Sequence, residues 1–115
     1  MNNWTAEEIA FRCDRLPVRI DRLTTNLLRL GSLSSSGTDE DSALAVLREN
    51  KAFIELTAID LDIDSAFELA QIQRQLSRWH IRWAETWANT SSRNEISTLT
   101  QNWANQLREI SGVFA

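Results

Sequence analysis

The residues best suited to chemistry gather in one predicted helix, where three tryptophans are spaced four residues apart beside the single histidine. Trp79, Trp83 and Trp87 share one face of that helix, and His80 lies at the edge of the same face. Trp103, in the next predicted helix, would lie nearby in an antiparallel partner. These side chains could form an aromatic pocket for a planar ligand, with His80 as an axial or hydrogen-bonding group. They could instead fill the core between helices, and we favour this second interpretation.

Arginines form a second set of candidate binding residues. Arg74, Arg78 and Arg82 are spaced four residues apart on the side of the same helix opposite the tryptophans. Their guanidinium groups could contact a phosphate-bearing or acidic partner. Alternatively, they form a solvated face or pair with carboxylates of a neighbouring helix, such as Glu49 or Glu55. The sequence leaves both interpretations open.

Other classes of site lack the residues that they need. A carboxylate-bridged di-iron bundle uses two Glu-x-x-His motifs, and this chain has one His with no Glu three positions before it. No pair of metal ligands has the spacing of a zinc site, and no glycine-rich phosphate loop occurs. The sequence therefore predicts neither a metal nor a cofactor, and it favours a protein that is not an enzyme.

One short pattern nevertheless keeps catalysis open. Arg74 and His80 fit R-x5-H within a predicted helical bundle of 115 residues. This pattern resembles that of the HEPN family of helical RNases and nucleotide-binding bundles, whose catalytic motif is R-x4–6-H. The resemblance covers two residues and a fold class, and it implies an RNase in which Arg74 and His80 form the catalytic pair across a dimer. On a helical wheel, Arg74 lies roughly 120° from His80.

Composition indicates a small globular protein. The chain has three Gly, one Pro and one Cys, and its net charge is −4. So few turn residues argue against a many-stranded β protein, and a single Cys permits no internal disulfide. The acidic balance argues against a nucleic-acid partner. No apolar run reaches the ~18 residues of a membrane span, and the N-terminal residues do not resemble a signal peptide, so we expect no membrane partner and a cytoplasmic location.

Helical patterns cover most of the chain, over residues 5–30, 39–60, 65–88 and 93–111. The first begins at a capping box formed by Thr5 and Glu8. Its apolar residues then recur at steps of four and three across Pro17, so we expect one helix kinked at that proline. Gly31 is expected to end this helix, and residues 31–38 to form a flexible link.

These four helices with short links predict an all-α chain, residues 1–115, folded as one antiparallel up-down-up-down four-helix bundle. Leu56 belongs to a second apolar face of the helix at 39–60, and Phe11 and Val18 lie opposite the apolar seam of the first helix. Because unpaired apolar faces commonly mark interfaces, we expect a homodimer or another protein partner to bind there. We therefore interpret the chain as a small non-enzymatic protein–protein interaction or regulatory module. The aromatic pocket and the HEPN-like RNase remain the alternatives.

Overall fold

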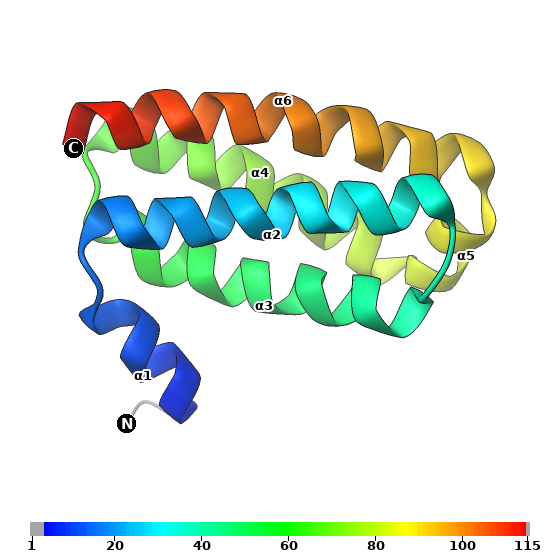
Figure 1. Cartoon of the computed structure of the whole chain (residues 1–115), viewed down its shortest axis with the longest axis horizontal. Coiled ribbons are helices and arrows are strands. Elements are labelled where there is room, and N and C mark those ends of the chain that lie inside the picture. Colours follow the sequence, from blue (N-terminus) through cyan, green and yellow to red (C-terminus); the bar gives the residue numbers. More distant parts are fainter. Residues whose placement is uncertain (1–3, 115) are drawn as a thin grey trace.

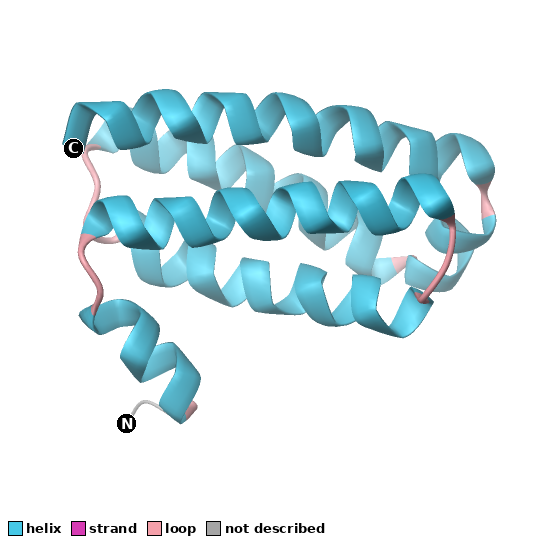
Figure 2. Cartoon of the chain, viewed as in Figure 1, coloured by secondary structure: helices cyan, strands magenta, loops and turns pink. Residues whose placement is uncertain are grey.

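The computed structural model describes residues 4–114, which fold into helices joined by short links (Figure 1; Figure 2). The helices in this range are α1 (Ala6–Cys13), α2 (Leu16–Ser36), α3 (Glu40–Ala58), α4 (Ile63–Ile81), α5 (Trp83–Ala88) and α6 (Thr90–Phe114). No strand occurs among these residues, so the prediction of an all-α chain is confirmed. The predicted domain also includes residues 1–3 and 115, which lie outside the described range.

The four long helices lie lengthwise along the molecule. In Figure 1, α2 and α4 run in one direction, and α3 and α6 run in the other. The most extensive contact joins α2 to α6; α2 also packs on α3, and α3 packs on α4. The short helix α1 contacts α3, and α5 lies against α6 at the opposite end of the molecule. The helix α4 is therefore packed on one flank by α3.

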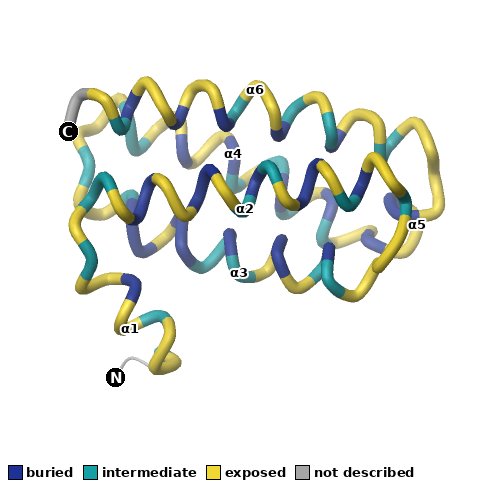
Figure 3. Tube along the Cα trace, viewed as in Figure 1, coloured by how far each residue is buried: buried dark blue, intermediate teal, exposed yellow. Residues whose placement is uncertain are grey.

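Buried residues recur along each long helix, as Figure 3 shows. Along α2 they are Ile20, Leu23, Leu27 and Leu30, at steps of three and four. This spacing is that of an apolar stripe on one side of a helix. The other long helices supply further fully buried side chains: Leu47, Leu69, Ile72, Leu76, Ile96 and Leu107. The part of the predicted apolar seam from Ile20 to Leu30 is thus the buried face of α2, whereas Ile9, in its first part, is 51% exposed.

The first predicted helix is divided in two, so the expectation of one helix kinked at Pro17 is wrong. α1 ends at Cys13, and the backbone of Asp14 and Arg15 is extended, with ψ of 154° and 152°. Pro17 has no N–H to bond the Cys13 carbonyl, and its ring would clash with that carbonyl in a continuous helix. In the structure, Pro17 lies in the first turn of α2, where no such bond is required. The extended pair lets α1 turn away from α2 toward α3.

The expected end of this helix at Gly31 is also wrong. α2 continues to Ser36 and ends at Gly37, whose φ of 69° is the left-handed conformation typical of a residue that ends a helix. Gly31 is buried within α2, where a Cβ would overlap the Thr100 hydroxyl of α6. Gly31 therefore permits close approach of α6, and most of the predicted flexible link is helical.

Side-chain caps mark the starts of α1, α3 and α4, whereas α2 and α5 begin without one. The capping box of α1 is confirmed: the Glu8 N–H donates to Thr5 Oγ1 and the Thr5 N–H donates to Glu8 Oε1, both at 3.1 Å. Asp39 accepts from the Ser42 N–H at the start of α3, and Asp62 accepts from the Ser65 N–H at the start of α4. Hydrogen bonding to the side chain and to the backbone N–H of Ser42 lowers the pKa of Asp39, and the same bonding to Ser65 lowers the pKa of Asp62.

The third predicted helix is interrupted near its end. α4 ends at Ile81, and Arg82, with φ −117° and ψ 42°, separates it from α5. Arg82 is neither glycine nor proline, so no helix-breaking residue marks this position in the sequence. The last helix begins at Thr90, three residues earlier than predicted, and it continues past Gly112.

Candidate functional site

The tryptophans considered for a ligand pocket lie in the core. Trp79, Trp83 and Trp87 are only 5%, 7% and 7% exposed, and the partly buried Trp103 packs against the same core. The rings of Trp79 and Trp103 meet between α4 and α6, with centroids 5.6 Å apart. None of three surface hollows, of about 450, 250 and 280 Å³, has a tryptophan in its lining. The aromatic side chains therefore fill space between helices.

His80 lies on the edge of α4 that faces α3, where two cations surround it. Arg48 Nε lies 3.4 Å from His80 Nε2, and Lys51 Nζ lies 3.0 Å from His80 Nδ1. Burial lowers the pKa of His80, and the positive charges of Lys51 and Arg48 lower it further. The imidazole is therefore neutral at pH 7. We call Arg48, Lys51 and His80 the basic cluster.

Arg74 is not part of this cluster. It is exposed on the outward side of α4, whereas the side chains that contact His80 come from α3. Arg74 and His80, the two residues of the R-x5-H pattern, are thus not brought together within one chain. The cations that contact His80 lie 29 and 32 residues earlier in the sequence.

Six of the nine exposed residues of α4 share one side of the helix, which we call the α4 outer face; the other three are Asp64, Glu68 and Gln71. The six are Ile63, Phe67, Ala70, Arg74, Arg78 and Ile81. These positions fall within an arc of about 80° and extend along ~27 Å of helix. The three large apolar side chains of the α4 outer face are Ile63, Phe67 and Ile81, which are 87%, 62% and 81% exposed. The arginines of this face were predicted from the sequence but their apolar neighbours were not, although helical spacing alone groups them together.

Arg74 and Arg78 lie one turn apart with no carboxylate to separate their charges. The positions three and four residues away from either one within α4 hold only neutral side chains and the arginines themselves. Within residues 4–114, neither guanidinium forms an ion pair. The third arginine considered with them, Arg82, lies beyond the end of α4 and is 3.8 Å from Glu85. The two remaining arginines are available to an outside group.

The carboxylates suggested as partners for these arginines have other contacts. Glu55 accepts a hydrogen bond from Gln73 at 3.2 Å. Glu49 faces α2, where it accepts from Asn26 at 3.1 Å and lies 4.0 Å from Arg22. Neither glutamate therefore neutralises the α4 outer face.

Two of the three apolar residues predicted for an interface are buried within the chain, which corrects that prediction. Phe11 is fully buried because the break before α2 folds α1 onto α3, where its ring stacks on Phe53. Leu56 is 5% exposed on α3, which is packed against α1, α2 and α4, and its carbonyl accepts from Arg19. Val18 remains 46% exposed.

Comparison of the chain with family models, curated proteins and solved structures found no match. Among the described residues, no helix is both long enough and apolar enough to cross a membrane. Within the same residues, no three His, Cys, Asp or Glu side chains gather as a metal site would require.

Proposed function

We propose that this chain is a non-enzymatic protein–protein interaction module that binds an acidic amphipathic helix of another protein along the α4 outer face. One observation carries the proposal: large exposed apolar side chains and uncompensated arginines share one side of one helix. Scattered exposed apolar residues are ordinary, but a row of them on a single helix face is a feature of binding surfaces. Aromatic residues and Arg are also the types enriched in interfaces.

The charge and the length of the α4 outer face indicate the chemistry of its partner. Arg74 and Arg78 present two positive charges one turn apart, and carboxylates spaced by one turn on a partner helix would pair with both. Apolar side chains of that helix would cover Phe67 and Ile81, which lie on either side of the arginines. The ~27 Å of exposed face equals about five helical turns, which suits a helical ligand.

We further propose that α2, α3, α4 and α6 act as an antiparallel up-down-up-down four-helix bundle that holds this face rigid. In such a bundle each helix packs on its neighbours and leaves one side to solvent. α4 contacts α3 on one flank, and Trp79 reaches Trp103 of α6 on another. The outward side of α4 then remains for a partner.

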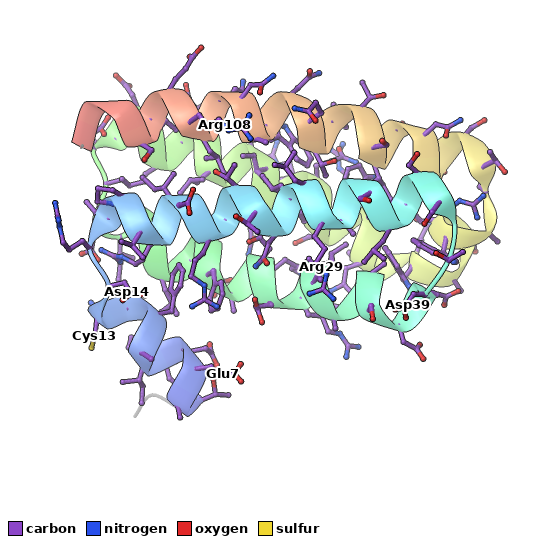
Figure 4. All side chains as sticks on the ribbon, viewed as in Figure 1. Glu7, Cys13, Asp14, Arg29, Asp39 and Arg108 are labelled. Carbon is purple, nitrogen blue, oxygen red and sulfur yellow. The ribbon has the colours of Figure 1, made fainter. Side chains whose placement is uncertain are left out.

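The cytoplasm is the compartment that we propose for this interaction. Cys13 is an exposed free thiol at the end of α1, where its sulfur projects from the helix (Figure 4). A lone exposed thiol suits a reducing compartment, because oxidising compartments favour paired cysteines.

Photo-cross-linking in the native cell tests the proposal. A photoreactive phenylalanine analogue replaces Phe67, and the control position is Arg108, which lies on α6 (Figure 4). Position 67 should cross-link to an acidic amphipathic segment of another protein, identified by mass spectrometry. The adduct should disappear when Arg74→Glu and Arg78→Glu are introduced together, since reversed charges repel the partner.

Two outcomes would overturn the proposal. Cross-linking of position 67 to a second copy of this chain would replace the acidic helix with a homodimer. Adducts at position 67 no stronger than those at position 108 would show that the α4 outer face is merely solvated. Circular dichroism of the double arginine variant confirms that lost cross-linking does not reflect lost folding.

A further inference from the structure

The basic cluster contains a hydrogen-bonding conflict. A neutral imidazole has one N–H and one acceptor nitrogen. Arg48 Nε–H can donate to Nε2 only when the proton is on Nδ1, and Lys51 can donate to Nδ1 only when the proton is on Nε2. In either tautomer, one of the two contacts places a donor against a donor. At least one cation of the cluster therefore lacks an acceptor.

Within residues 4–114, no carboxylate lies within ion-pair distance of either cation, although Glu7, Glu8 and Glu49 line the same surface hollow as Arg48. Glu55 lies one turn beyond Lys51 on α3, and one of its oxygens accepts from Gln73. Beyond His80 along the chain, the one carboxylate of α5 is Glu85, whose Oε2 lies 3.8 Å from Arg82 Nη1. The cluster thus holds two positive charges around a neutral ring.

The cluster is accessible from solvent. Arg48 is exposed, and Lys51 and His80 are each partly exposed. Both cations are on long flexible side chains of one helix, while the imidazole is held by the facing helix. A small ligand could therefore enter between the side chains without movement of either backbone.

We propose that the basic cluster binds a dianionic oxyanion, the phosphate group of a small soluble molecule. The two positive charges of Arg48 and Lys51 match the two negative charges of a phosphate monoester. A tetrahedral oxyanion offers acceptors in several directions, so both cations can donate to it without competing for the imidazole. The N–H of His80 supplies a third donor from α4. This site lies on the flank between α3 and α4 and is separate from the α4 outer face.

Binding at this site is coupled to protonation of His80. Burial, together with the positive charges of Lys51 and Arg48, holds the pKa of His80 below its ordinary value in the free protein. A bound dianion compensates their charge and favours the imidazolium, so it raises the pKa of His80. Ligand binding then takes up a proton, and affinity increases as the pH falls through the interval between the two pKa values.

Proton NMR of the single histidine provides the test, because its ring resonance is unique in the spectrum. Sulfate is the probe, since its charge stays −2 between pH 5 and pH 8, and sodium chloride at equal ionic strength is the reference. Sulfate should shift the His80 resonance saturably and raise the pKa of His80. Chloride should do neither beyond the effect of screening. Inorganic phosphate should compete with sulfate.

Three variants locate the site. Arg48→Gln and Lys51→Gln should each weaken sulfate binding about tenfold, as expected for loss of a charge-assisted hydrogen bond. Arg108→Gln, an exposed arginine on α6 with the same loss of charge, should leave it unchanged. Calorimetry of His80→Gln should show sulfate binding that is weaker than in the natural chain and whose affinity no longer depends on pH.

The proposal is overturned if chloride reproduces the effect of sulfate on His80, because the charges would then only be screened. It is also overturned if Arg48→Gln and Lys51→Gln bind sulfate as tightly as Arg108→Gln does. Neither result depends on whether the α4 outer face binds a protein, so the two proposals succeed or fail separately.

Discussion

The ring of Phe11 in α1 lies flat on the ring of Phe53 in α3, with centroids 3.9 Å apart and planes inclined by 2°. The Arg22 guanidinium lies over the same pair, 4.7 Å from the Phe53 ring centroid and 5.5 Å from that of Phe11. Phe11 is the one buried residue of α1. This stack is therefore the main contact that holds α1 against the long helices.

Phe11→Ala should lower the free energy of unfolding by about 3 kcal/mol, because it removes a fully buried ring. The amides of α1 should also exchange faster with deuterium, since that helix loses its anchor. Urea unfolding and hydrogen-exchange mass spectrometry measure the two effects. The matched control is Phe67→Ala: Phe67 is 62% exposed, so its loss should cost less than about 0.5 kcal/mol. Equal losses in the two variants would contradict the burial of Phe11.

Gly31→Ala should destabilise the chain by about 1–3 kcal/mol, although alanine is the better helix former. The added methyl would overlap the Thr100 hydroxyl, which already donates to the Ile96 carbonyl at 2.7 Å. Thermal unfolding measures the loss, and adding Thr100→Ala should restore part of it by making room. Gly112→Ala provides the opposite control, since its Cβ meets nothing within 4 Å. The Gly112→Ala variant should be slightly more stable. If both substitutions changed the stability in the same direction, the close contact between Gly31 and Thr100 would be refuted.

Arg19→Met should lower the free energy of unfolding by about 1–3 kcal/mol, because two acceptors lose a charged donor. Arg19 is 5% exposed, and its Nη1 donates to the Leu56 carbonyl at 2.9 Å and to Asp60 Oδ2 at 2.8 Å. The lost contacts join the start of α2 to the end of α3. Arg15→Met, at an exposed position nearby, should change stability by less than about 0.5 kcal/mol. Chemical unfolding of both variants is the measurement, and similar midpoints would argue against the role of Arg19.

Stability should fall as the pH decreases through the ordinary pKa range of histidine. The pKa of His80 is lower in the folded chain than its usual value of 6.5, so the unfolded state binds the proton more readily. The stabilisation that comes from the neutral His80 is present above pH 6.5. It is lost as the pH falls toward the lower pKa that His80 has in the folded chain. Urea unfolding between pH 5 and pH 8 should show this slope in the natural chain and a smaller slope in His80→Gln. Parallel curves for the two proteins would disprove the shift.

Local signals in the sequence identified the helices and their apolar sides. The Thr5–Glu8 capping box formed as predicted, because its two hydrogen bonds join residues three apart. The seam from Ile20 to Leu30 is buried because helical periodicity determines which side chains share a side. The same periodicity placed Arg74 and Arg78 outward.

Features that depend on a distant segment were misjudged or missed. Gly31 resembles a helix end, and only the approach of α6 gives it a packing role instead. A continuous first helix would expose Phe11 for an interface, whereas the break before α2 folds it onto Phe53. Leu56 belonged to an apolar face whose covering helices the sequence could not identify.

The sequence by itself determined the helical class, the apolar sides and the first cap, because these depend on contacts within about one turn of helix. The tertiary structure alone decided where α1 lies, which apolar residues stay exposed on α4 and which cations surround His80. Arg48 and Lys51 are 32 and 29 residues from that histidine. Their meeting depends on how α3 packs on α4, and no local spacing of residues encodes that contact.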